Sequence, residues 1–93
     1  MINRKHYGIV VFPSSSAASQ AEIKMIEKGW TIRLIPIPEQ ISAGCGLVLQ
    51  LAIDDLKEIE AVMTKETIIY DGIYEVSVSD KRKKTILPWK QKG

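Results

Sequence analysis

The sequence predicts an α+β domain of the ferredoxin-like type, in which a βαββαβ chain forms a four-stranded antiparallel sheet with two helices on one face. Three observations lead to this prediction. Residues 7–12 and 47–53 are nearly uninterrupted apolar runs, as expected of central strands. Residues 18–26 and 56–63 carry apolar side chains at helical spacing. The chain has 93 residues, 45% of them hydrophobic, which is enough for one core and too few for two.

The first predicted helix follows the first strand directly. A Pro-Ser-Ser-Ser sequence ends the strand, because proline cannot donate to a sheet, and its hydroxyls suit a helix N-terminus. These hydroxyls belong to Ser14, Ser15 and Ser16. An apolar stripe continues to Met25, and Gly29 is expected to end the helix.

The second predicted strand, residues 31–37, is expected at an edge of the sheet. Pro36 and Pro38 cannot donate hydrogen bonds to a neighbouring strand, so they mark the point where the chain leaves the sheet and shape the loop that follows. The third strand, residues 47–53, is expected to be central.

The remaining elements complete the pattern. Asp54 and Asp55 are expected to cap the second helix. An Asp-Gly turn at residues 71–72 precedes a last strand of alternating apolar residues, 73–78.

Right-handed crossovers then place two parts of the chain together. The loop after the first strand and the hairpin after the second strand lie at the same ends of the strands of the sheet. The N-terminus of the first helix, with its three serines, is therefore expected on the same side of the domain as Cys45.

Cys45 is the candidate functional residue. It is the only cysteine in the chain and stands between Gly44 and Gly46, which allow unusual backbone angles and leave the sulfur unshielded. A cysteine that only fills a core stands more often inside an apolar run. The alternative is that Cys45 is an inert, partly buried residue, as lone cysteines in small domains often are.

A pattern of residues extends over roughly residues 7 to 78: Phe12, Ser15, Ala18, Glu22, Gly29, Arg33-Leu34-Ile35-Pro36, Pro38, Ser42 and Cys45-Gly46. This pattern resembles that of the small bacterial family of selenium/sulfur carrier-like proteins. Its most specific part is Pro-x-Pro followed by Cys-Gly. The resemblance implies a thiol that carries sulfur or selenium between a donor and an acceptor protein. Two positions depart from the pattern: Ser15 replaces a threonine, and Glu39 replaces an arginine that would help to stabilise a thiolate.

The predicted position of Cys45 near the N-terminus of the first helix would favour an anion on its sulfur. A helix N-terminus presents unpaired backbone N–H groups and a partial positive charge. We therefore expect the pKa of the thiol to lie below its usual value of about 8.5. The backbone N–H of Gly46 would be a further donor, whereas Glu39 would oppose the shift.

The basic character of the chain is confined to its C-terminus. Six cations and one acidic residue give residues 80–93 a formal charge of +5, so the rest of the chain carries −3. We expect one domain, residues 1–79, followed by a basic flexible tail, residues 80–93, that folding does not require. The charge of the body gives no support to binding of nucleic acid or membrane.

Several classes of function are excluded by residue type. The chain has one cysteine and one histidine, too few for a structural zinc site, and no P-loop or dinucleotide-binding motif. His6 precedes the first strand and so starts from the edge opposite Cys45. We expect no metal, no cofactor and no self-contained catalysis. The absence of a signal-peptide core and of a disulfide pair favours the cytoplasm.

Two functions of different class remain open. In the first, Cys45 is a carrier thiol. In the second, the domain is a non-catalytic ferredoxin-like interaction module, with a homodimer as one form, in which the glycines and prolines only shape a hairpin. The sequence does not distinguish sulfur from selenium.

Overall fold

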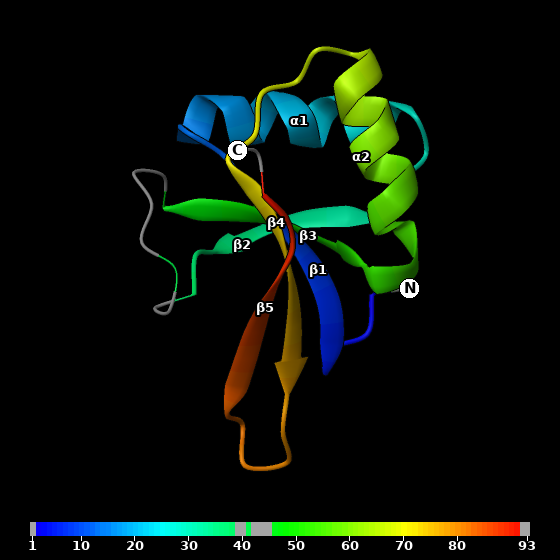
Figure 1. The fold of residues 1–93 in the computed structure, drawn as a ribbon. Helices are drawn as coiled ribbons and strands as arrows, with labels where there is room; N and C mark the ends of the chain where they lie inside the picture. Colours follow the sequence, from blue (N-terminus) through cyan, green and yellow to red (C-terminus); the bar gives the residue numbers. More distant parts are fainter. Residues whose placement is uncertain (1, 39–40, 42–45, 92–93) are drawn as a thin grey trace.

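The computed structural model describes residues 2–38, 41 and 46–91, which form a five-stranded antiparallel sheet and two helices (Figure 1). The strands are β1 (His6–Val11), β2 (Ile32–Pro36), β3 (Leu47–Ala52), β4 (Gly72–Val78) and β5 (Lys84–Gln91). The helices are α1 (Ser15–Glu27) and α2 (Leu56–Lys65), and a short 3₁₀ turn, Ile53–Asp55, precedes α2.

The strand order across the sheet is β2-β3-β1-β4-β5. β1 lies between β3 and β4, and β3 lies between β2 and β1. The predictions that the first and third strands are central and that the second is an edge strand are therefore confirmed. All neighbouring strands are antiparallel.

The prediction of a four-stranded sheet is wrong, because β5 extends the sheet beyond β4. The β4–β5 pairing runs from Val78 opposite Lys84 to Gly72 opposite Gln91. Most of the segment expected to be a tail thus belongs to the sheet. The charged residues that suggested a tail form a tight turn instead, closed by a 2.8 Å hydrogen bond from Arg82 N to the carbonyl oxygen of Ser79.

The two helices pack on one face of the sheet. Their buried residues form a cluster with buried residues of the sheet and the segment before β4. The cluster contains Val10, Phe12, Ala18, Ala21, Met25, Leu49, Leu51, Leu56, Ile59, Met63, Tyr70 and Ile73, and Trp89 of β5 is packed against it. The β-bulge between Ile73 and Tyr74 in the β4–β5 pairing leaves Trp89 without a direct partner on β4.

The opposite face of the sheet has a smaller cluster that contains no helix residue. It consists of Tyr7, Ile9, Val11, Val48 and Val76. The apolar run of β1 therefore serves both faces, since alternate side chains of a strand point to opposite sides. Burial raises the pKa of the Tyr7 phenol, because desolvation disfavours its charged form.

Both ends of α1 carry the signals predicted from the sequence. The Ser14 hydroxyl accepts a hydrogen bond from Ala17 N at 3.1 Å, which satisfies one of the unpaired N–H groups of the first turn. At the other end, Gly29 has a φ of 90°. Hydrogen bonds from Trp30 N to the Met25 carbonyl and from Gly29 N to the Ile26 carbonyl complete a Schellman motif.

Gly8 allows α2 to approach the sheet closely. A Cβ atom at this position would lie 2.5 Å from Cδ2 and 2.7 Å from Cγ of Leu56, the first residue of α2. We expect Gly8→Ala to lower the free energy of unfolding by about 1–3 kcal/mol, because Leu56 is fully buried and has no space into which to move. Urea denaturation measures the change.

Gly46→Ala is the matched control for Gly8→Ala. A Cβ atom at Gly46 would meet nothing within 4 Å, so this variant is expected to keep the stability of the wild type. Equal stability of all three proteins would contradict the close approach of α2 to β1.

Candidate functional site

The connection between β2 and β3 contains the predicted functional cysteine. Cys45, Gly44 and Glu39 lie outside the described residues. The base of the connection is described: Ile37 N donates a 3.0 Å hydrogen bond to the carbonyl oxygen of Gly46, which adds one rung beyond the last residues of β2 and β3. The chain neighbour of Cys45 is therefore held in the ladder of the sheet.

The two prolines occupy different environments at this base. Pro36 is exposed at the end of β2, opposite Leu47. Because Ile37 and Gly46 form a hydrogen-bonded pair, the alternation of an antiparallel ladder directs the nitrogen of Pro36 away from β3, where it has no bond to lose. Pro38 is buried, and its carbonyl accepts a 3.0 Å hydrogen bond from Ile41 N. Pro36 thus fits the place predicted for it at the end of an edge strand, and the loop-shaping role of the two prolines stays a prediction.

The space around Gly46 is open. An added Cβ atom there would meet nothing within 4 Å. Gly46 is exposed, so what it contributes is the absence of a side chain beside Cys45.

The register of the sheet places the serines beyond the same ends of the strands as Gly46. Val48 lies opposite both Val11 of β1 and Ile35 of β2. Ser14 follows Val11 by three residues, and Gly46 precedes Val48 by two residues, so both lie beyond the same ends of these strands (Figure 1). Ser14, Ser15 and Ser16 are exposed, and the Ser14 hydroxyl is used as the cap of α1.

His6 lies at the other end of β1, as expected. Its Nε2 is 3.3 Å from Oε2 of Glu75 on β4. Among the described residues no group of three or more histidine, cysteine, aspartate or glutamate residues could hold a metal ion. No helix in the described part of the chain has the length and apolar character needed to cross a membrane.

A groove beside the β2–β3 connection was not predicted from the sequence. One wall is formed by Ile35, Pro36, Ile37 and Pro38, and the other by Arg82, Lys83 and Lys84. Its volume is about 540 Å³. We call it the basic groove. It was missed because the cations of residues 81–84 were assigned to a flexible tail.

The comparison with protein families assigns residues 7–75 to the family described as "Putative Se/S carrier protein-like". The chain belongs to this family. The match extends from β1 into β4 and includes the β2–β3 connection with Cys45, whereas the basic turn and β5 lie beyond it. Searches of curated proteins and of solved structures found no match to the chain.

Proposed function

We propose that the protein carries sulfur or selenium on Cys45 between a donor and an acceptor protein. The observation that carries the proposal is the family match, because its residues include the only cysteine of the chain. The position of Gly46 in the ladder supports it further, because it fixes the base of the connection that contains Cys45.

The exchange chemistry needs no oxidant. The Cys45 thiolate attacks the terminal sulfur of a donor persulfide, a new S–S bond forms on Cys45, and the donor S–S bond breaks. The donor cysteine leaves as a thiolate, and the terminal sulfur keeps its proton or loses it to water. A single cysteine suits this role, because no second thiol of the same chain can discharge the persulfide as an internal disulfide.

The architecture proposed for the carrier is a ferredoxin-like domain with one added strand. The order of elements from β1 to β4 is βαββαβ, and both helices lie on one face. The N-terminus of α1 lies beyond the same ends of the strands as Gly46. The unpaired N–H groups of the first turn of α1 would favour an anionic persulfide or perselenide there. A free thiol that cycles in this way fits the reducing cytoplasm.

Loading of the wild-type protein tests the proposal. The protein is incubated with a cysteine desulfurase and free cysteine, and in a second reaction with selenocysteine as the substrate. Intact-protein mass spectrometry is expected to show the addition of one sulfur or one selenium atom, which maps to the peptide containing Cys45 and is removed by reduction. Failure with several desulfurases and both substrates would contradict the proposal.

A further inference from the structure

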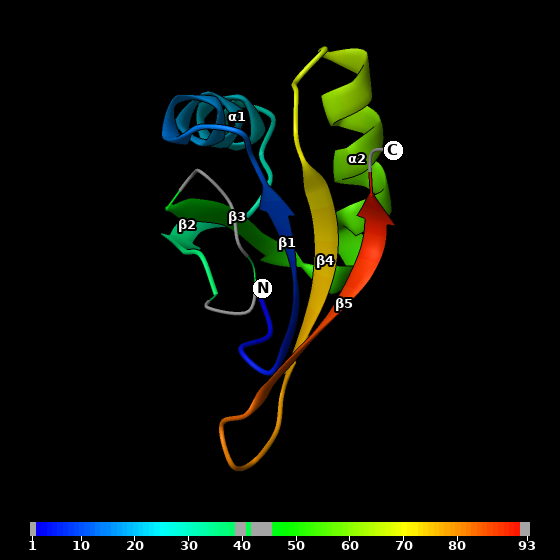
Figure 2. The same cartoon turned by 60° about the vertical axis from the view of Figure 1, so that its left-hand side comes forward.

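The basic groove combines an apolar wall with a cationic wall. The apolar wall comes from the end of the edge strand β2 and the residues that follow it. The cationic wall comes from the turn between β4 and β5, which we call the basic turn: Lys81, Arg82, Lys83 and Lys84, all exposed. Figure 2 shows the β4–β5 hairpin projecting beyond the other strands, so the cations stand on a protruding part of the molecule.

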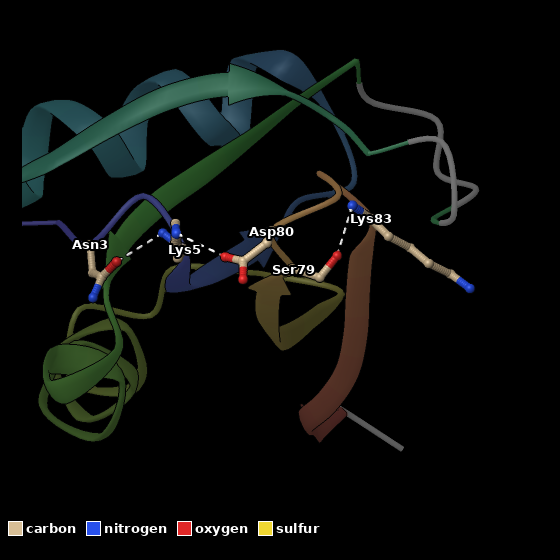
Figure 3. Close-up of polar contacts among 5 residues, drawn as sticks. All are labelled: Asn3, Lys5, Ser79, Asp80 and Lys83. Atoms are coloured by element: carbon tan, nitrogen blue, oxygen red, sulfur yellow. Dashed lines mark hydrogen bonds and ion pairs between the residues drawn. The ribbon is translucent and has the colours of Figure 1, made fainter.

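The acidic residue beside these cations faces another partner. Asp80 is the only acidic residue in residues 80–93, and its Oδ1 lies 3.2 Å from Nζ of Lys5 (Figure 3). Lys83 extends in the opposite direction from Asp80 in this view, while its backbone N donates to the Ser79 hydroxyl at 3.2 Å. The carboxylate of Asp80 is therefore paired with a cation outside the basic turn.

The backbone of the basic turn makes the arginine an unexpected choice. Arg82 has a φ of 61°, in the left-handed region where glycine or asparagine is preferred. Folding alone would favour one of those residues at this position. A cation at a position where the backbone disfavours it indicates a use for its charge.

The groove is joined to the loop that contains Cys45. Ile37 lines the groove, and its N–H bonds to the carbonyl oxygen of Gly46, the residue next to Cys45. Any segment seated in the groove would lie beside the base of the β2–β3 connection. Binding there would bring a partner close to the loop that has to enter its active site.

We propose that the basic groove docks an acidic segment, with interspersed apolar side chains, of the protein that exchanges sulfur or selenium with Cys45. This inference rests on the proposed carrier function and names the chemistry of its partner. The apolar wall fits aliphatic side chains, and the cations fit carboxylates at the rim, where charges mainly raise the rate of association. Single-stranded nucleic acid fits less well, because proteins that bind it stack its bases on exposed aromatic side chains, and none of the described residues that line the groove is aromatic.

Peptide binding with a charge-neutralised groove tests this inference. The probe is a fluorescein-labelled peptide of sequence Glu-Leu-Glu-Glu-Leu-Glu-Gly-Gly, followed by fluorescence anisotropy. The variant combines Arg82→Asn with Lys83→Gln, and asparagine suits the left-handed backbone, so the turn should fold at least as well. We expect its affinity for the peptide to be lower by about fivefold, and wild-type binding to weaken with added salt.

The control variant combines Lys57→Gln with Lys65→Gln. These exposed lysines are on α2, which packs on the other face of the sheet, and the change in net charge is the same. It should bind the peptide like the wild type, as should Cys45→Ser. Peptide binding by Cys45→Ser separates docking from sulfur loading, since the docking inference can fail while the carrier function holds, and the reverse.

Four outcomes would overturn the docking inference. The first is that the wild type does not bind the peptide at low salt, and the second is that the α2 control loses as much affinity as the groove variant. The third is that an oligouridylate of the same charge binds more tightly than the peptide. The fourth is that the wild type sediments as a dimer in analytical ultracentrifugation and the groove variant as a monomer. The last outcome would make the groove an interface between two copies of this chain.

Discussion

A chain that ends at Ser79 is expected to lose about 3 kcal/mol or more of its free energy of unfolding, and to be largely unfolded if the whole protein has only ~5 kcal/mol. The truncation removes β5 and exposes the length of β4 as a new edge. It also removes Trp89 from the cluster under the helices and Ile86 from the cluster on the other face. Thermal and urea denaturation of the two chains measure the loss.

Two point variants separate side-chain packing from strand pairing. Trp89→Ala should cost about 2 kcal/mol, less than the ~3–5 kcal/mol of a fully buried tryptophan, because Trp89 is only partly buried. Leu87 is on the same strand but 57% exposed, and Leu87→Ala should change stability by no more than about 0.5 kcal/mol. If the truncated chain kept the stability of the whole protein, the body would be independent of β5.

The elements that could be predicted are those whose local signals agree with their tertiary environment. Helix α1 begins at a serine cap and ends at a glycine in the left-handed region, and both signals are local. Strands β1 and β3 are mostly apolar, because each packs on both faces.

Strand β5 could not be predicted because its neighbours in the sequence concealed it. The cations Lys81, Arg82 and Lys83 before it suggested a solvated tail, whereas they belong to a tight turn. Its apolar residues Ile86 and Trp89 contact different faces of the sheet, and the β-bulge at Trp89 disturbs strict alternation. Such a strand is recognisable only beside β4.

One part of the candidate site could be predicted from the sequence and another could not. Topology alone predicts that the N-terminus of α1 and the β2–β3 connection lie beyond the same ends of the strands. The register of β1, β2 and β3 agrees with this prediction. The basic groove depends on how the β4–β5 hairpin approaches Pro36 and Pro38 in space, and no local sequence signal encodes that approach. The family match covers one wall of the groove and stops before the other.

Cys45→Ser is expected to abolish transfer of sulfur or selenium completely, while folding and binding of the acidic peptide stay unchanged. An alcohol oxygen forms no persulfide, so no residual exchange is expected from this position. The measurement is passage of radiolabelled sulfur from a loaded desulfurase through the protein to an acceptor. Cys45→Ala should give the same loss, which would exclude an effect of the serine hydroxyl.

The same variant decides between the carrier and the interaction module. In cells that depend on the protein, a carrier with Cys45→Ser has no function, although its groove is intact. In an interaction module the order is reversed: Cys45→Ser is tolerated, and the double neutralisation of Arg82 and Lys83 removes function. A carrier whose partner docks in the groove loses activity in both variants, but for different reasons. The cysteine variant loses it at every protein concentration, whereas the groove variant regains it at high concentration, because docking raises only the rate of encounter and the occupancy of the complex.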